Sequence, residues 1–302
     1  MKRILVFVAF CGLTISASAQ AGGDVWKKRV APIVAGASTD YEKARAIYDW
    51  EVKNILYDYT FRVKDGETAW IGHKGVCYAF CDIYVNLAAA CGLEAVTIGG
   101  VGRNGMKSDG KAIHNWVRVK TERGWIFVDP TWGSCNSHAD RGSNGGKYAE
   151  YSRQAEMWFD IDPQWLIFTH FPNDPEEQHL ETPLTEQQYM GLPYITPEAG
   201  FLGWDAGKML RYFLNNPGVK GPQICAVPNA MRGKLQLVEV PFRLKAGQKY
   251  TIKVRSQLPL GDEWKPVGDT GVYAWTFTAQ AGKSYPIYLF EGNRGTAVVI
   301  LQ

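Results

Sequence analysis

Two stretches in the first third of the chain repeat apolar residues at the spacing of an α-helix. We expect the first helix over residues 41–55, with Thr39 or Asp40 as its cap. The second is expected over residues 77–91, where Gly92 can end it. Each helix buries one face, because apolar side chains recur every three or four residues. These are Ala44, Ile47, Tyr48 and Val52 in the first helix, and Phe80, Ile83, Tyr84 and Leu87 in the second.

Strand patterns follow directly after the second helix. Residues 94–101 are rich in β-branched side chains and predict a strand. Residues 113–120 and 125–129 alternate between apolar and polar positions on either side of a turn at 121–124, which predicts a β-hairpin. Helices followed by an antiparallel sheet indicate an α+β fold for this part of the chain.

The pattern changes from about residue 203. Short strand-like runs separated by Gly and Pro are typical of a β-sandwich, and only a short helix capped near Thr185 is expected shortly before them. We therefore predict a signal segment at 1–19, an α+β domain with its downstream extension at 20–202, and an all-β, sandwich-like domain at 203–302. The strand-like runs cover residues 235–240, 250–255, 272–278, 284–290 and 296–301.

The first nineteen residues are typical of an export signal. Lys2 and Arg3 precede an apolar run at 4–13, and small residues at 17–19 form a cleavage pattern. The apolar run is too short to span a bilayer as a stable helix. We expect export to the periplasm, the cell surface or the medium after cleavage near Ala19, without stable membrane insertion.

Composition and charge narrow the classes of partner. The 302 residues are 46% hydrophobic and 21% charged, with a net charge of +3, which is ordinary for a globular protein. Removing residues 1–19 takes away two cations and no acids, so the charge falls from +3 to +1. The remaining chain has no basic run, which argues against nucleic acid as a partner. The sequence leaves the oligomeric state open.

An odd number of cysteines remains after that cleavage. At least one thiol must then lack a partner within the chain. Cys77 and Cys81 are four residues apart on one expected helix, too far apart for an unstrained disulfide. We interpret Cys81, Cys91 and Cys225 as buried thiols, although their pairing and that of Cys135 stay open. The five cysteines are Cys77, Cys81, Cys91, Cys135 and Cys225.

Cys77 stands at the start of its expected helix. A helix N-terminus carries partial positive charge and free N–H groups, which lower the pKa of a thiol and can hold an oxyanion. A thiol nucleophile also needs an imidazole as proton acceptor. Of the five histidines, His114 alone lies in a strand pattern, between Ile113 and Val117. The simpler interpretations, a structural cysteine and a solvated strand histidine, weaken when the two residues are considered together.

The hairpin can bring Asp129 next to His114. If Lys120 pairs with Trp125, then Trp116 pairs with Asp129, and His114 lies two residues along on the same face. Diagonal neighbours of this kind can touch. Asp129 would then fix the tautomer of the imidazole and support the imidazolium. A bulge in the turn would change which side chains share a face.

Three blocks of residues, in this order, resemble the transglutaminase-like superfamily. They are Gly75-Val76-Cys77, His114-Asn115-Trp116-Val117, and the ten residues from Gly124 to Gly133. Thr131-Trp132-Gly133 and the segments 159–163, 169–172 and 183–193 are similar to the kyphoscoliosis-peptidase branch. The resemblance covers about residues 40–200. Val76 stands where the superfamily often has Asp, and Asn115 stands where Ala is commoner, but neither departure removes a catalytic group.

The resemblance implies a papain-like α+β fold and acyl chemistry on amides of a protein or peptide substrate. It places the nucleophile, base and orienting acid on Cys77, His114 and Asp129. We expect a cysteine hydrolase that acts through a thioester, because export gives access to abundant water. Transfer to an amine, as in a true transglutaminase, is the first alternative. A silent scaffold whose β-domain binds a partner is the second, and the presence of all three residues argues against it.

Further groups at the site stay open. A second oxyanion donor could come from Trp50, Tyr57 or Trp70, which the sequence does not rank. A zinc site is an alternative use of the cysteines, but their spacing is not that of a zinc ribbon. For calcium, the sequence shows no clear acidic loop of the kind that binds this ion. We therefore expect neither a metal nor a cofactor. The residues that a zinc site would combine are Cys77, Cys81, Cys91, Cys135 and His138.

Overall fold

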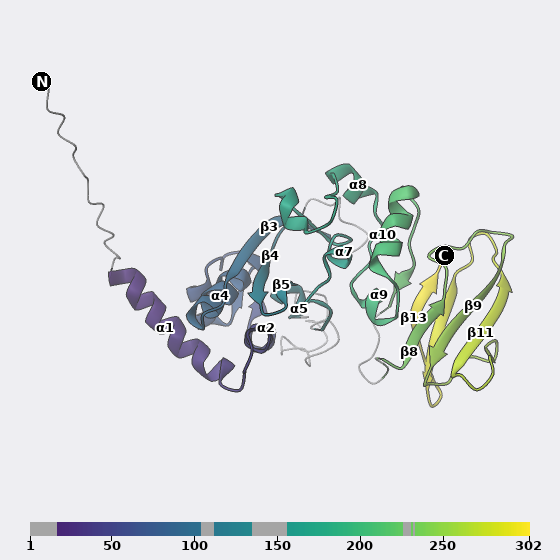
Figure 1. The fold of residues 1–302 in the computed structure, drawn as a ribbon, viewed down its shortest axis with the longest axis horizontal. Coiled ribbons are helices and arrows are strands. Elements are labelled where there is room, and N and C mark those ends of the chain that lie inside the picture. Colours follow the sequence, from purple (N-terminus) through teal and green to yellow (C-terminus); the bar gives the residue numbers. More distant parts are fainter. Residues whose placement is uncertain (1–16, 104–111, 135–155, 226–230, 232) are drawn as a thin grey trace, which may run out of the picture.

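Figure 1 shows the computed structural model of the chain, with N-terminal helices at one end and a β-rich region at the other. An antiparallel sheet and several short helices lie between them. The structure describes residues 17–103, 112–134, 156–225, 231 and 233–302. Three stretches lie mostly outside the described residues. They are the expected signal segment, a glycine-rich stretch at 103–110 and a polar stretch at 134–146, both of which the sequence pattern indicates as loops.

The first helices are α1 (Ala17–Val34), α2 (Asp40–Asn54), α3 (Gly66–Gly72) and α4 (Cys77–Ala90). Thr39 caps α2 by accepting a hydrogen bond from the Glu42 amide, and the Glu42 side chain accepts one from the Thr39 amide in return. Such a capping box satisfies two amides that the helix itself leaves free. The helix α3 lies in a polar stretch where the sequence pattern predicts no helix. Helix α4 begins at Cys77, as its pattern predicts.

The central sheet has the strand order β5-β4-β3-β6, and every pair in it is antiparallel. Its hairpin has the predicted register, because Lys120 pairs with Trp125 and the ladder runs to Val117 and Val128. Trp116 and Asp129 do not extend it. The Asp129 amide instead donates to the carbonyl of Trp158. The strands are β3 (Ala95–Gly102), β4 (Ala112–Thr121), β5 (Gly124–Val128) and β6 (His170–Pro172).

Helix α4 forms the centre of the core. It packs against β3 and β4 of the sheet and against the helices α1, α2 and α3. The side chains between these elements are large, apolar and fully buried, and each contributes about 1.5–3 kcal/mol relative to an exposed position. This arrangement is the α+β core that the sequence predicts. Its largest members include Tyr48, Phe80, Ile83, Tyr84 and Trp116.

Short helices follow the sheet. Helix α8 begins after Thr185, which forms a capping box with Gln188, as the sequence indicates. One helix corrects the prediction that the chain is all-β from residue 203. Helix α10 is capped by Asp205, buries Met209 and Phe213, and packs against α7 and α8. The elements are α5 (Pro130–Gly133), α7 (Pro163–Leu166), η2 (Pro175–Gln178), α8 (Glu186–Gly191), α9 (Glu198–Phe201) and α10 (Ala206–Asn215).

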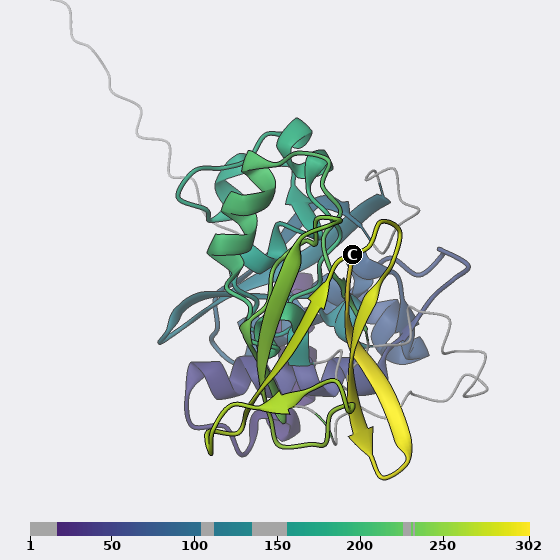
Figure 2. The same ribbon diagram turned by 90° about the vertical axis from the view of Figure 1, so that its right-hand side faces the viewer.

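The C-terminal region is rich in β-strands, and Figure 2 shows its strands in front of the core. One sheet has the order β10-β11-β9-β8 and the other has the order β12-β13-β7. The five strand-like runs of the sequence correspond to β8, β9, β11, β12 and β13, while the sandwich arrangement stays a prediction. The strands are β7 (Gln223–Ile224), β8 (Leu235–Glu239), β9 (Lys249–Ser256), β10 (Lys265–Pro266), β11 (Val272–Thr278), β12 (Tyr285–Glu291) and β13 (Arg294–Leu301).

Glycines in β3 let neighbouring elements approach closely. A Cβ added at Gly100 would meet the Phe171 carbonyl oxygen and would lie 2.7 Å from Cη2 of Trp116. A Cβ added at Gly102 would lie 3.0 Å from Cβ of His114 and 3.1 Å from Cζ2 of Trp132. A glycine inside a strand often marks such a close approach. These positions therefore let β6 and α5 reach the sheet.

Gly100→Ala should lower the free energy of unfolding by about 1–3 kcal/mol, because the added methyl group overfills a packed site. Denaturant unfolding followed by tryptophan fluorescence would measure the change. Gly191→Ala is the matched control, since a Cβ there meets nothing within 4 Å, and it should change stability by less than about 1 kcal/mol. Equal losses in the two variants would contradict this account of β3.

Candidate active site

The thiol of Cys77 lies at the first residue of α4. Val76 precedes it as the N-cap and makes no side-chain capping hydrogen bond. Just upstream, the short strand β2 (Lys74–Gly75) pairs in parallel with β1 (Leu56–Tyr57) and fixes the approach of the chain to the helix. Cys77 itself is partly exposed. The sulfur therefore combines a helix N-terminus with access for a reagent, the setting in which cysteines become nucleophilic.

His114 lies on β4 and is nearly fully buried, with 6% of its surface exposed. Its Nε2 is 2.8 Å from Oδ2 of Asp129. Because Nε2 is engaged in this way, Nδ1 is the nitrogen left to interact with the Cys77 thiol. The ring stacks on Trp132, with centroids 5.1 Å apart and planes 23° apart. Packing and the carboxylate together fix the orientation of the imidazole.

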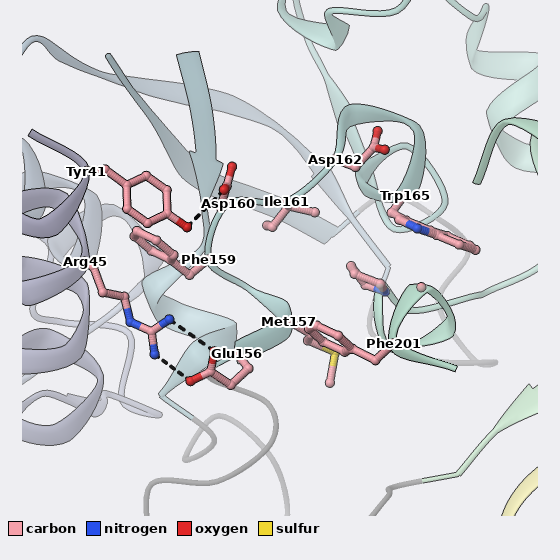
Figure 3. Close-up of a pocket in the computed structure, with 12 residues that line it drawn as sticks. Tyr41, Arg45, Glu156, Met157, Phe159, Asp160, Ile161, Asp162, Trp165 and Phe201 are labelled. Carbon is pink, nitrogen blue, oxygen red and sulfur yellow. Dashed lines mark hydrogen bonds and ion pairs between the residues drawn. The ribbon is translucent and has the colours of Figure 1, made fainter. Parts of the chain in front are cut away.

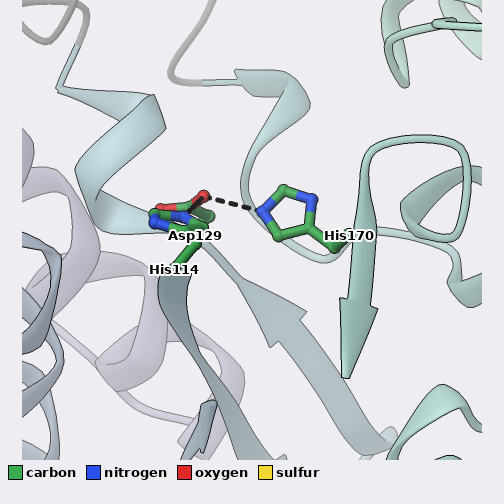
Figure 4. A group of neighbouring side chains, drawn as sticks. All are labelled: His114, Asp129 and His170. Atoms are coloured by element: carbon green, nitrogen blue, oxygen red, sulfur yellow. Dashed lines mark hydrogen bonds and ion pairs between the residues drawn. The ribbon is translucent and has the colours of Figure 1, made fainter. Parts of the chain in front are cut away.

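Asp129 lies at the N-cap of α5 and is fully buried. Its Oδ1 accepts a hydrogen bond from the Trp132 amide at 3.0 Å. Its Oδ2 interacts with Nε2 of both His114 and His170, at 2.8 and 3.0 Å (Figure 4). Burial by itself would raise the pKa of the carboxyl, but the two histidines hold this pKa well below its usual range. Asp129 is therefore a carboxylate at neutral pH.

The charges of Cys77 and His114 are coupled. Burial would lower the pKa of His114, but the Asp129 carboxylate and the Cys77 sulfur raise it to about 10. Burial would raise the pKa of the Cys77 thiol, but His114 and Asn115 lower it on balance. Both shifts favour a thiolate next to an imidazolium, which is the reactive form of a cysteine nucleophile.

Two residues at the site were not identified from the sequence. Asn115 follows His114, and its Nδ2 donates to Sγ of Cys77 at 3.6 Å. His170 reaches Asp129 from β6, although its short, Pro-flanked segment resembles a loop. The only signals in the sequence were the departure from the common Ala at position 115 and the branch resemblance of residues 169–172.

The candidates for a second oxyanion donor separate in the structure. Trp50 and Trp70 stack on each other, with ring centroids 4.2 Å apart. Tyr57 instead interacts electrostatically with Cys77. The pKa of its phenol is raised to about 12, mainly by burial and next by the charge of Cys77. Tyr57 pairs with Gly75, two residues before Cys77. Of the three, Tyr57 is the one that the structure places beside the thiol.

The cysteines and possible metal ligands can also be placed. Within the described ranges, the free cysteines are Cys77, Cys81, Cys91 and Cys225; Cys135 and His138 lie outside those ranges. Cys81 is buried as expected, whereas Cys91 and Cys225 are only partly buried, which corrects that prediction. His114, Asp129 and His170 form the one group in the described residues that could offer three metal ligands, with ligand atoms within 4.8 Å of one another. Separations of 2.8 and 3.0 Å are those of N–H···O hydrogen bonds. Each imidazole of the cluster therefore has the Asp129 carboxylate as a hydrogen-bond partner.

A cavity of about 330 Å³ lies elsewhere. Figure 3 shows Arg45 and Glu156 paired across its edge, with 2.6 Å between Nη2 and Oε1. Asp160 and Trp165 also line it. None of Cys77, His114 and Asp129 contributes to the lining. We place the candidate site at the thiol, because a cysteine and its histidine base are there, while the described residues that line this cavity include neither a cysteine nor a histidine.

The comparisons with known proteins fit this geometry. Residues 27–130 match the family model of the transglutaminase-like superfamily. The chain carries a transglutaminase-like domain. The matched residues contain Cys77, His114 and Asp129, and the α+β core around them is the papain-like core expected from the sequence. In the part of the chain that the structure describes, no helix is long and apolar enough to cross a bilayer.

Curated relatives support the branch as well. Hillarin of Drosophila melanogaster is 27% identical over 183 residues, which are 55% of this chain and 22% of that protein. The kyphoscoliosis peptidase of Mus musculus is 25% identical over 180 residues, which are 56% of this chain and 26% of that protein. The chain thus spans about a quarter of the length of these relatives. A solved structure described as a TGase has a TM-score of 0.32 and 19% identity, with 40% of this chain and 35% of that chain covered.

The state of the thiol predicts its reactivity. Because the pKa of Cys77 is lowered, iodoacetamide should alkylate it with a midpoint below pH 8.5, roughly the pKa of a free thiol. Burial raises the pKa of Cys91 and Cys225, so these should react more slowly at pH 6. His114→Ala removes the imidazolium and should move the Cys77 midpoint upward.

Mass spectrometry of each alkylated peptide, between pH 5 and pH 10, would measure these rates side by side. The alkylation rates of the Cys91 and Cys225 peptides serve as controls within the same sample. If Cys77 reacted no faster than Cys225 at pH 6, the thiol would not be activated.

Proposed function

We propose that this chain is an exported cysteine hydrolase that cleaves amide bonds of a protein or peptide substrate through a thioester. The observation that carries the proposal is the buried hydrogen bond between His114 and Asp129 at the thiol of Cys77. A nucleophile, a base and a group that orients the base are the parts that such a reaction requires. The match to kyphoscoliosis peptidase supports a peptide substrate.

The first half of the reaction acylates the thiol. The thiolate of Cys77 attacks the amide carbon, a C–S bond forms, and the π electrons of the carbonyl move onto its oxygen. The N–H groups at the start of α4 and the amide of Asn115 lie near the sulfur and would stabilise this oxyanion. The C–N bond then breaks as His114 gives its proton to the leaving amine, which leaves a thioester.

The second half releases the acyl group. Neutral His114 takes a proton from a water molecule, and the resulting hydroxide attacks the thioester carbon. The C–S bond breaks, the product leaves as a carboxylic acid, and the thiolate is restored beside the imidazolium. Asp129 keeps its negative charge throughout, which stabilises the imidazolium in both halves.

Amine transfer uses the same groups, with an amine in place of water in the second half. The geometry of the three residues is common to both reactions, so the acceptor that reaches the thioester decides the outcome. We take water as the acceptor, because it is always present and the sequence implies no specific amine acceptor. The scaffold alternative is weaker, since the buried His114–Asp129 pair and the partly exposed thiol are all retained.

The enzyme should hydrolyse amides rather than attach amines. Unfolded casein, a broad source of peptide and glutamine amides, would be incubated with the protein and a fluorescent primary amine. We expect new peptide termini, or glutamate in place of glutamine, with little amine incorporated. Mass spectrometry distinguishes these products.

Cys77→Ala should abolish the reaction by removing the nucleophile. Cys225→Ala is the matched control and should retain it, because Cys225 directly follows β7 and its amide donates to the Val298 carbonyl of β13. Predominant amine incorporation would identify a transferase. No product from a protein with native circular dichroism and an unreactive thiol would favour a scaffold.

Export also gives a measurable product. When the full chain is produced in a Gram-negative host, the mature protein in the periplasm should begin at Gln20. Ala17→Asp and Ala19→Asp place charges where signal peptidase requires small residues, so both should block cleavage. Ala21→Asp should be cleaved normally as the control. An uncleaved wild-type chain in the cytoplasm would contradict the proposal.

A further inference from the structure

His170 is the second imidazole on the Asp129 carboxylate, and the fold holds it rigidly. In β6 it pairs with Gly102 of β3, and 1% of its surface is exposed. Its ring packs against Trp132, with centroids 4.4 Å apart, and against Trp116, with centroids 4.9 Å apart. Figure 4 shows it reaching the carboxylate from a different element than His114. The ring therefore has little freedom to turn away from Asp129.

The hydrogen bonds around His170 fix its proton. The Asp129 carboxylate can only accept, so Nε2 of His170 must donate to it across 3.0 Å. Oγ1 of Thr169 lies 2.8 Å from Nδ1. Burial lowers the pKa of His170 to about 4, so the ring is neutral at pH 7 and Nδ1 carries no proton. Nδ1 and the Leu166 carbonyl, 3.1 Å from Oγ1, are then the two acceptors that the Thr169 hydroxyl can reach. His170 is thus a permanent donor to Oδ2, whereas His114 changes its charge.

We propose that His170 is a positioning residue, whose Nε2–H holds Oδ2 of Asp129 where Nε2 of His114 requires it. The inference rests on the proposed function, because it concerns the same thiol and base. It extends that site to a chain of five side chains: Cys77, His114, Asp129, His170 and Thr169.

The need for this donor follows from the other contacts of the carboxylate. Without His170, two donors to the Asp129 carboxylate would remain among the described residues. The Trp132 amide would still donate to Oδ1, and only His114 would contact Oδ2. Oδ2 could then turn away from the imidazole, and His114 could adopt the tautomer that places a proton on Nδ1. In that neutral tautomer Nδ1 already carries a hydrogen, so it cannot accept the proton of the thiol. The thiolate would lose its partner, and its formation would require a higher pH.

The other ionisable groups around the site do not complicate this titration. Glu51 of α2 is fully buried, and burial and then the charge of Asp129 raise its pKa. Burial raises the pKa of Cys81 on α4 in the same way, and Tyr57 beside β2 is shifted to about 12 by burial and by Cys77. In all three groups the shift favours the neutral form. The alkylation profile therefore follows the coupled thiol and imidazole of Cys77 and His114, whose pKa values are lowered and raised by each other.

Two substitutions separate the donor from the ring. His170→Phe keeps an aromatic ring among the tryptophans but has no N–H. His170→Gln loses the ring but can place an amide N–H near the position of Nε2. His179→Phe is the matched control, because His179 contacts Phe127 and Arg118 instead of Asp129. Iodoacetamide is the probe, so the test needs no knowledge of the substrate.

In His170→Phe, the midpoint of Cys77 alkylation should rise by about one pH unit, which lowers the rate at pH 6 about tenfold. His170→Gln should restore most of the wild-type profile, and His179→Phe should keep all of it. Circular dichroism confirms that each variant is folded. Where His170→Phe does not fold, the comparison of His170→Gln with His170→Ala at the same pH values gives the same test.

The outcomes are distinct for the two proposals. A wild-type thiol that is not activated overturns the proposed function. A wild-type thiol that is activated, with an unchanged or lowered midpoint in folded His170→Phe, overturns the positioning role alone. A raised midpoint that His170→Gln fails to restore also overturns it, because the ring rather than the donor would then be responsible.

Discussion

The site depends on one buried carboxylate. Asp129 has no exposed surface, and an unpaired charge at such a position would be very costly. Its charge is sustained by donors from three elements: His114 on β4, the Trp132 amide in α5 and His170 on β6. These elements must therefore be in place together. The same contacts fix the imidazole of His114 and, through it, the charge of the Cys77 sulfur.

Close packing around the carboxylate makes this convergence possible. Gly100 and Gly102 leave room on β3 for the chain of β6 and for the indole of Trp132. Helix α4 packs against β3 and β4, so the thiol at its first residue meets the imidazole on β4. A helix N-terminus and an imidazolium then act on one sulfur from two directions. Both favour the thiolate.

The chemistry of the site is more general than a single reaction. Under the proposed function, hydrolysis and amine transfer would share the acylation of Cys77 and would differ only in the acceptor that meets the thioester. Selectivity therefore depends on what surrounds the sulfur rather than on the three residues themselves. Tyr57 and Asn115 are two such neighbours of the sulfur. The charge of Cys77 contributes to the raised pKa of Tyr57, and Asn115 donates a hydrogen bond to the Cys77 sulfur. The family match covers residues 27–130 and leaves the β-rich region without an assigned role.

The sequence by itself determined those features that depend on near neighbours. Apolar spacing predicted α2 and α4, alternation predicted the register of the hairpin, and turn residues separated the C-terminal strands, because each pattern reflects contacts within a helix or between adjacent strands. Only the tertiary structure decided the position of His170. It lies 41 residues from Asp129 on a strand of three residues, too short to show a period. Helix α10 was also missed, since its buried face is defined by packing against α7 and α8. Contacts between distant segments leave no local pattern in the sequence. Only the folded structure therefore shows that a second imidazole, that of His170, contacts the Asp129 carboxylate.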